Sequence, residues 1–255
     1  MILTDTHCHL YAEEFTADID DVINRAAAAG VQKFYLPAID STAHTKMINL
    51  EQQYPGNCFA MMGLHPCYVK ANYEEELQLV ADWLSKRKFV AVGEIGLDFY
   101  WDKTFTDQQY IAFRRQIEWS LQYDLPIVIH TRNAMAETIA VVKEYVSKNV
   151  RGIFHCFSGN AGDAAAITAM GFCLGIGGAI TYKNSGVAQA IEQTDPQYLV
   201  LETDAPYLTP VPFRGKRNES SYLKYVVEKL AQVKNMPVTE LAAITTANAQ
   251  KIFGS

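Results

Sequence analysis

A regular alternation of short apolar runs and longer amphipathic stretches extends along the chain and leaves few folds open to it. Eight apolar runs, several of them rich in Val, Ile and Phe, have the length and composition of strands that are buried on both faces. We predict strands at residues 2–6, 33–36, 58–63, 90–95, 127–130, 152–156, 172–176 and 198–202. We predict helices at residues 18–29, 45–53, 74–86, 107–123, 134–147, 161–170, 187–192, 220–234 and 238–249.

Strict alternation of strands and helices predicts parallel strands joined by crossover helices. Eight such units favour an α/β fold that closes into a (β/α)8 TIM-like barrel. A doubly wound open sheet is the alternative if one or two of the runs are loops. The length of 255 residues suits one barrel as well as two smaller domains. No internal repeat, low-complexity tract or Pro/Ser-rich linker interrupts the sequence, so we expect a single domain over residues 1–255.

Histidines and carboxylates gather where the predicted strands end. Five of the six histidines and two carboxylates lie at or next to the ends of apolar runs. These residues are His7, His9, His65, Glu94, His130, His155 and Asp204. In barrel enzymes the carboxyl ends of the strands carry the active site, which is assembled from several strands. This placement favours the barrel over the open sheet.

The same residues have the composition of a metal site. Residues two apart in a strand point to one side, so the imidazoles of His7 and His9 can converge on a divalent ion. The candidate ligands are His7, His9, Glu94, His130, His155 and Asp204. Four imidazoles and two carboxylates exceed what one tetrahedral zinc takes and suit two ions that share a carboxylate and activate a water. We predict a metal-dependent hydrolase in which Glu94 bridges the ions and Asp204 accepts a proton from the water.

Each candidate also has an ordinary structural explanation when it is taken alone. His7 and His155 would serve as satisfied core histidines, and Glu94 as a buried carboxylate beside a cation. Asp204 precedes Ala205-Pro206 and would serve as a turn residue. Six such placements at strand ends are improbable by chance, so the metal site is favoured.

Two neighbouring features resemble other kinds of site. Cys8 and Cys156 sit beside candidate ligands but alternate to the opposite side of their strands, so we expect them to pack inside the barrel. The glycines at residues 175–178 resemble a phosphate-binding loop. They lack a following Lys-Ser/Thr pair and full GxGxxG spacing, so a tight turn after the seventh strand is favoured.

Composition limits the remaining possibilities. A net charge of −6 argues against general affinity for nucleic acid, but it leaves room for a local basic rim. Arg214, Lys216 and Arg217 place three cations within four residues, although a solvated turn has the same composition. Five cysteines without a CxxC pattern, and no leader at Met1, predict a reduced, cytoplasmic protein with free thiols. No apolar run approaches the roughly 18 residues of a membrane span, and no obligate protein partner is implied.

At this level of detail the chain resembles the TatD-like deoxyribonucleases of the amidohydrolase-type metal-dependent hydrolase superfamily. The resemblance spans nearly the whole chain and rests on long, ordered motifs. They are Asp5-Thr6-His7-Cys8-His9-Leu10, Gly63-Leu64-His65-Pro66, Gly93-Glu94-Ile95-Gly96-Leu97-Asp98-Phe99-Tyr100, His130-Thr131-Arg132, Phe154-His155-Cys156-Phe157-Ser158-Gly159, Glu202-Thr203-Asp204-Ala205-Pro206-Tyr207-Leu208, Arg214-Gly215-Lys216-Arg217-Asn218-Glu219 and Asn248-Ala249-Gln250-Lys251-Ile252-Phe253.

The resemblance implies a distorted (β/α)8 barrel that hydrolyses phosphodiester bonds of DNA, as an exonuclease, with two divalent cations (Mg, Mn or Zn). It implies that His7, His9 and Asp204 hold one ion and that His130 and His155 hold the other. Glu94 would bridge them. The positions implicated in phosphate or substrate contact are His65, Arg132, Arg214, Lys216 and Arg217. Cys67, Asn133 and Phe213 depart from residues common in the family, and these departures concern the substrate rather than the metal ligands.

Two other functions compete with a DNA nuclease. One is hydrolysis of a lactone, ester or amide on the same scaffold. Many such relatives bridge their metals with a carbamylated lysine, and no lysine ends the strands that carry Glu94 and His130. The other is a non-catalytic binding module, which the presence of all six candidate ligands disfavours.

Overall fold

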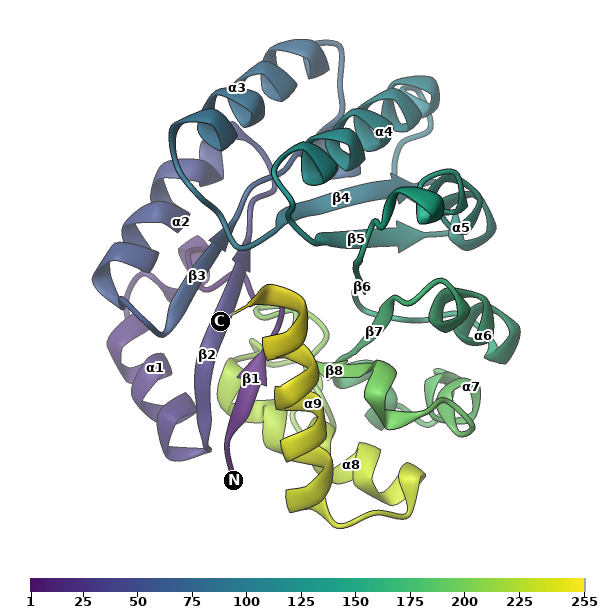
Figure 1. The fold of residues 1–255 in the computed structure, drawn as a ribbon. Coiled ribbons are helices and arrows are strands. Elements are labelled where there is room, and N and C mark those ends of the chain that lie inside the picture. Colours follow the sequence, from purple (N-terminus) through teal and green to yellow (C-terminus); the bar gives the residue numbers. More distant parts are fainter. Residues whose placement is uncertain (255) are drawn as a thin grey trace.

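The structure is a computed structural model that describes residues 1–254. Its parallel strands form two sheets with the orders β1-β2-β3 and β4-β5-β6-β7-β8 (Figure 1). The strands are β1 Leu3–Asp5, β2 Val31–Pro37, β3 Cys58–Met61, β4 Val92–Asp98, β5 Ile127–Arg132, β6 Gly152–Phe154, β7 Cys173–Ile176 and β8 Leu199–Leu201.

Backbone hydrogen bonds close the two sheets into a barrel. On one side the amide of Gly93 donates to the carbonyl of Met62 at 3.0 Å, next to a parallel bridge between Met62 and Val92. On the other side the amide of Thr6 donates to the carbonyl of Leu201 at 3.0 Å. The predicted TIM-like barrel is therefore confirmed, with two joints that are held by few hydrogen bonds rather than by full ladders.

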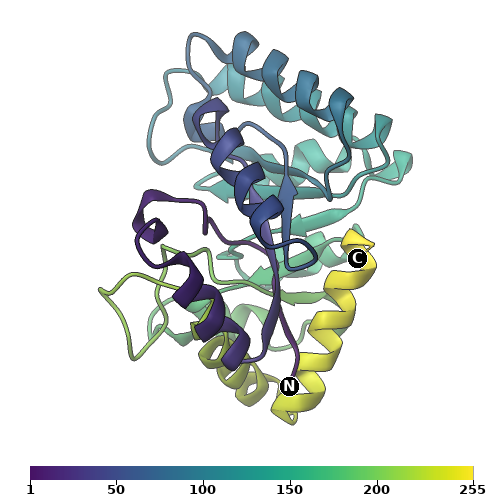
Figure 2. The ribbon, with the colours of Figure 1, turned by 90° about the vertical axis from the view of Figure 1, so that its left-hand side faces the viewer.

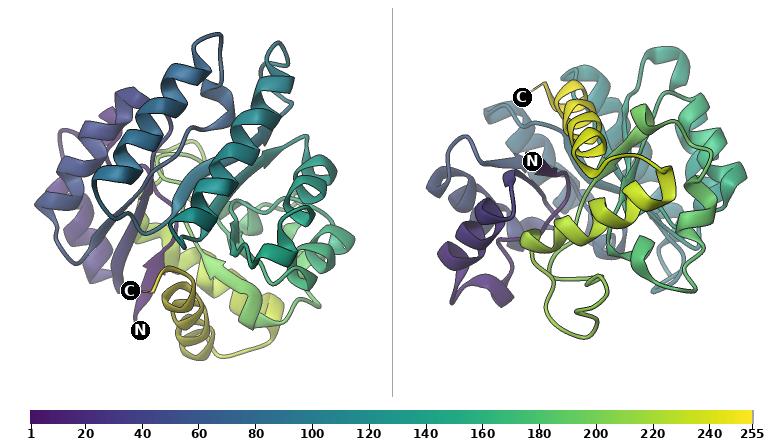
Figure 3. Two further views of the ribbon diagram at one scale, coloured as in Figure 1. Left: turned by 45° about the horizontal axis from the view of Figure 1, so that its top comes forward. Right: turned by 90° about the horizontal axis from the view of Figure 1, so that it is seen from below.

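Helices surround the barrel, as the left panel of Figure 3 shows. They are α1 Ile19–Ala28, α2 Ser41–Gln53, α3 Tyr73–Lys86, α4 Thr106–Gln122, α5 Met135–Lys143, α6 Ala161–Ala169, α7 Val187–Ile191, α8 Leu223–Lys234 and α9 Val238–Phe253. Within residues 1–254, no helix combines the length and the hydropathy that crossing a membrane requires.

One end of the barrel is closed by α9. Side chains from six strands, among them Tyr35, Val128 and Val200, form a cluster inside the barrel together with Ala91, just before β4, and α9 joins this cluster through Ala249 and Phe253. The rings of Tyr35 and Phe253 stack with centroids 3.9 Å apart. In Figure 2 and in the right panel of Figure 3, α9 lies at this end, and the loop between β8 and α8 lies at the other. The other end of the barrel, at the carboxyl ends of the strands, is not covered by α9 and can therefore carry a polar site.

Several predicted boundaries were wrong, for local reasons. The helix predicted at 45–53 begins at Ser41, because the Asp40 side chain accepts a hydrogen bond from the amide of Thr42 and caps it. The helix predicted at 238–249 continues to Phe253, whose ring packs inside the barrel. The strand predicted at 90–95 runs from Val92 to Asp98, because β5 pairs with it to that point.

Candidate metal centre

A cavity of about 870 Å³ opens at the carboxyl ends of the strands. The residues that line it include His9, His65, Glu94, Asp98, His130, Arg132, His155, Cys156 and Asp204. His7 is fully buried behind them and contacts Glu94. Cys156 was expected to pack inside the barrel and instead lines this cavity, because its backbone turns into the left-handed region (φ +48°) just after β6.

Glu94 lies at the middle of the cluster. Its Oε1 atom is 3.0 Å from Nδ1 of His130 and 2.7 Å from Nε2 of His155. Its Oε2 atom is 3.2 Å from Nε2 of His7 and 3.7 Å from Nε2 of His9. The two oxygens of one carboxylate therefore face two different pairs of imidazoles.

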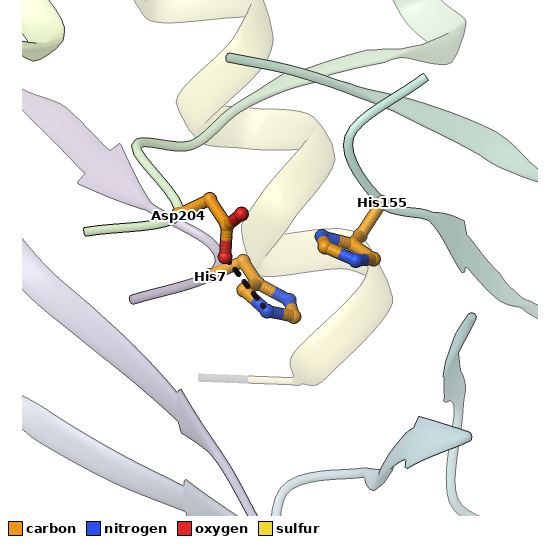
Figure 4. Close-up of side chains that lie close together, drawn as sticks. All are labelled: His7, His155 and Asp204. Carbon is orange, nitrogen blue, oxygen red and sulfur yellow. Dashed lines mark ion pairs between the residues drawn. The ribbon is translucent and has the colours of Figure 1, made fainter. Parts of the chain in front are cut away.

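Asp204 approaches the first of these pairs from the loop after β8. Its Oδ1 atom is 3.4 Å from Nε2 of His9 and 3.7 Å from Nε2 of His7. The amide of Asp204 donates to the carbonyl of His7 at 2.9 Å, which ties the loop after β8 to the segment after β1. Figure 4 shows the Asp204 carboxylate beside the ring of His7, which stacks on the ring of His155 with centroids 3.9 Å apart.

Hydrogen-bond partners assign the protons of two of the imidazoles. The Tyr11 hydroxyl donates to the carbonyl of Pro37 at 2.6 Å, so it accepts from Nδ1 of His9 at 2.9 Å and leaves the Nε2 lone pair of His9 free. Asp98 Oδ2 lies 2.9 Å from Nε2 of His130. An ionised carboxylate only accepts, so this contact places a proton on Nε2 of His130, and the neutral ring then has its free lone pair on Nδ1. Both free lone pairs point at carboxylate oxygens.

This arrangement fits cations rather than hydrogen bonds. Nε2 of His7 and Nε2 of His9 lie only 3.3 Å apart, and the lone pair of His9 and the Glu94 carboxylate repel each other unless a positive charge lies between them. Imidazole nitrogens with carboxylate oxygens suit zinc, manganese and similar ions. In the part of the chain that the structure describes, three groups of side chains place their ligand atoms within 4.8 Å of one another. They are His7, His155 and Asp204; His7, His9 and Glu94; and His65, Glu94 and His130.

His65 differs from the other histidines of the cluster. Its Nδ1 atom accepts a hydrogen bond from the amide of Cys67 at 3.0 Å, so the neutral ring carries its proton on Nε2, 3.4 Å from Glu94. Burial lowers the pKa of His65 to about 4. A neutral imidazole with its N–H directed into the cavity can act there as a hydrogen-bond donor.

Charge compensation keeps the carboxylates ionised. Burial by itself would raise the pKa of Glu94, but His155, His65, His7 and His130 outweigh burial and hold that pKa well below its usual value. Burial also opposes ionisation of Asp204, and the neighbouring histidines lower its pKa. Conversely, Glu94 and Glu202 overcome burial and raise the pKa of His155 well above its usual value. A metal ion held by these nitrogens would therefore compete with protons for them.

Two carboxylates behind the histidines were missed by the sequence reasoning. Asp98 holds Nε2 of His130, and Glu202 Oε1 lies 3.6 Å from Nδ1 of His155 while it accepts from the amide of Cys156. The signal was present, because Asp98 is four residues after Glu94 in one strand and Glu202 two before Asp204. Carboxylates in this position orient a ligating imidazole and increase its basicity.

A glycine in β7 makes room for Glu202. A Cβ atom on Gly175 would lie 2.2 Å from Oε2 of Glu202, a fully buried carboxylate. The first glycine of the 175–178 segment therefore lets a carboxylate approach the backbone of β7. This contact gives the glycine a structural role beside the turn that the sequence suggested.

The structure separates the five predicted substrate residues. His65 and Arg132 line the cavity, whereas the lining contributed by residues 1–254 does not include Arg214, Lys216 or Arg217. The Arg217 guanidinium pairs with Asp18 at 2.7 Å and lies over the ring of Phe15. The Arg214 guanidinium lies 3.9 Å from the ring centroid of Tyr182, and Lys216 Nζ 5.6 Å from that of Phe213.

Comparisons with known proteins agree with this architecture. The sequence model of the TatD related DNase family matches residues 4–254. The chain is 40% identical over 253 residues to YabD of Bacillus subtilis, named an uncharacterized metal-dependent hydrolase, with 99% of each protein covered. It is 30% identical over 257 residues to a protein of Erwinia tasmaniensis named 3′-5′ ssDNA/RNA exonuclease TatD, with 98% of each covered.

Solved structures show the same fold. The crystal structure of YJJV, a TatD homologue from Escherichia coli, superposes with a TM-score of 0.94 at 30% identity, covering 99% of this chain and 98% of that one. An organophosphorus hydrolase from Deinococcus radiodurans shares the fold alone, with a TM-score of 0.70 at 11% identity over 99% of this chain and 93% of its own. From its barrel, its histidine and carboxylate cluster and these matches, the chain belongs to the TatD related DNase family of metal-dependent hydrolases.

Proposed function

We propose that this hydrolase is a deoxyribonuclease that cleaves phosphodiester bonds of single-stranded DNA from an end, with two divalent cations. The observation that carries the proposal is Glu94, one buried carboxylate whose two oxygens face two separate pairs of imidazoles. The substrate is supported by the Erwinia tasmaniensis and Yersinia pseudotuberculosis relatives, both named 3′-5′ ssDNA/RNA exonucleases.

The free lone pairs suggest how the ligands divide. His7, His9 and Asp204 would hold one ion, His130 and His155 the other, and Glu94 would bridge them. Magnesium, manganese or zinc would serve, and the four imidazoles favour the transition ions. When bound, the pair of ions supplies an acidified water and neutralises charge on the phosphoryl oxygens.

The chain's own side chains account for the remaining steps. Asp204 is ionised and lies beside His7 and His9, so it can take the proton that the attacking water loses. His65 directs a neutral N–H into the cavity and can donate to a phosphate oxygen. Arg132 lines the same cavity and can hold a neighbouring phosphate as a bidentate donor.

The three cations of the loop after β8 have different roles in this proposal. The charge of Arg217 is neutralised by Asp18, so we assign it to ordering the loop. Arg214 and Lys216 remain candidate phosphate contacts beyond the cavity.

We also propose the cytoplasm as the compartment, because all five cysteines are free thiols, three of them buried.

The test is digestion of end-labelled single-stranded and duplex DNA by the purified protein, with each metal added separately. A lactone and an amide panel run beside it, and Glu94→Gln serves as the control for contaminating nuclease. We expect shortening of the single strand from its 3′ end that depends on added metal and is lost in the variant. Robust lactone or amide turnover with intact DNA would replace the nuclease by the other hydrolase, although none of the lysines of residues 1–254 lines the cavity to bridge metals in that way.

A further inference from the structure

Exposed aromatic side chains gather at the mouth of the metal cavity. Tyr68, Trp101 and Tyr207 line the cavity, yet 40%, 69% and 56% of their surfaces are exposed. Tyr100 is 51% exposed and contacts Trp101, with ring centroids 4.9 Å apart. Large exposed aromatic surfaces in one place mark a site for a ligand that covers them.

A cation completes this surface. The guanidinium of Arg132, at the end of β5, lies 3.9 Å from the ring centroid of Tyr100 and 5.2 Å from that of Trp101. Other arginines of residues 1–254 pair with carboxylates, namely Arg25, Arg87, Arg114, Arg115, Arg151 and Arg217. Arg132 has no such ion pair among these residues, so its charge is available to an anionic ligand.

The aromatic pair is held in a fixed position relative to the metal centre. Asp98 Oδ1 accepts from the amides of Tyr100 at 2.9 Å and Trp101 at 3.1 Å, while its other oxygen holds the metal-site imidazole of His130. The amide of Phe99 donates to the carbonyl of Arg132 at 2.9 Å. The buried carboxylate of Asp98 thus connects the turn that carries Tyr100 and Trp101 to the candidate metal ligands.

We propose that Tyr100, Trp101 and Arg132 form a stacking platform that binds an unpaired base of a single-stranded nucleic acid next to the bond to be cut. The inference rests on the proposed nuclease function and adds the residues that would select a single strand. An aromatic ring at a cavity mouth can stack on any base, because every base has a π-face, and the arginine adds a cation–π contact and a phosphate partner. The inner bases of a duplex are already stacked and paired, so they cannot occupy the platform without melting.

The test measures binding by metal-loaded protein that carries Asp204→Asn, so that cleavage of the probe is slow compared with the measurement. Three probes carry a 5′ fluorophore: an oligothymidylate of eight nucleotides, an abasic oligonucleotide of equal length, and a blunt hairpin duplex. Trp101→Ala is compared with Trp101→Phe and with Tyr123→Ala, a matched control because Tyr123 is an exposed aromatic that follows α4 and lies outside the cavity lining.

We expect Trp101→Ala to weaken oligothymidylate binding by about 5- to 150-fold, the range for loss of one base–aromatic stack. Binding of the abasic probe and of the duplex should stay unchanged. Trp101→Phe should restore most of the affinity, and Tyr123→Ala should change nothing. Oligothymidylate should also quench tryptophan emission in the parent protein and not in Trp101→Ala, since the other tryptophans lie on α3 and α4.

Three results would overturn the platform. Unchanged oligothymidylate binding by Trp101→Ala, with wild-type protein still cutting DNA, would remove the platform and leave the nuclease. Equal losses for the oligothymidylate and abasic probes would show that Trp101 supports phosphate contacts or loop structure instead. If wild-type protein cuts no DNA and the Asp204→Asn protein binds none of the probes, the nuclease and the platform both fail.

Discussion

Replacing Asp98 by asparagine would test whether a hydrogen bond decides which nitrogen of His130 can bind a metal. Asp98 is buried, and its Oδ2 atom lies 2.9 Å from Nε2 of His130. Nδ1 of the same ring faces Glu94 at 3.0 Å. Because a carboxylate only accepts hydrogen bonds, it keeps the proton on Nε2 and leaves Nδ1 free for a cation.

The Asp98→Asn variant keeps the shape and reverses this preference. The new carbonyl oxygen can still accept from the amides of Tyr100 and Trp101, at the 2.9 and 3.1 Å seen for Asp98. The new amide nitrogen then faces His130 and donates to Nε2, so the ring proton moves to Nδ1, where the metal should bind. Loss of an orienting carboxylate costs about 10- to 100-fold in metal affinity. That factor is about 1.4–2.7 kcal/mol, within the range for a hydrogen bond to a charged group.

Calorimetric titration of manganese into metal-free protein measures the effect. We expect one of two sites to weaken by about 10- to 100-fold in Asp98→Asn and the other to change little. Asp102→Asn is the matched control, because Asp102 lies in the same loop and pairs with Lys70 at 2.7 Å without touching an imidazole. If Asp98→Asn folds with an unchanged Tm and binds both ions as wild type does, the tautomer argument is refuted.

Four further predictions concern the ions, the proton acceptor and two cations of the basic loop. Elemental analysis after dialysis against metal should give about two equivalents for wild type and about one for the His130→Ala/His155→Ala double variant; one equivalent for saturated wild type would contradict the two-ion site. Asp204→Asn should slow cleavage by about 10²–10⁴-fold with little change in DNA affinity, and a rate within a few-fold of wild type would place the base elsewhere. Arg217→Ala should cost about 0.2–1 kcal/mol in the free energy of unfolding, because its ion pair is partly exposed. Arg214→Ala should leave Tm unchanged and flatten the slope of log affinity against log salt by about 0.7 on single strands, and an unchanged slope would make that residue a solvated turn residue.

The barrel and the family could be predicted from the sequence, because both depend on patterns along the chain. Eight apolar runs separated by amphipathic helices allow few arrangements other than a closed parallel barrel. Parallel strands bring their carboxyl ends to one face, so the sequence predicts that residues as far apart as His7 and Asp204 lie together. In the structure, Nε2 of His7 is 3.7 Å from Oδ1 of Asp204. Their role as metal ligands stays a prediction.

The hydrogen bonds that distinguish one histidine from another came only from the tertiary structure. The sequence contains no information on which nitrogen of His65 or His130 faces inward, because the partners are a backbone amide next to one and a carboxylate 32 residues from the other. In the same way, Arg132 and Arg217 look alike in sequence, and only the fold decides whether a carboxylate neutralises their positive charge. A carboxylate 199 residues away neutralises Arg217, whereas aromatic rings leave the charge of Arg132 available. Local patterns determine which elements form, and only the packing of those elements decides which polar atoms meet.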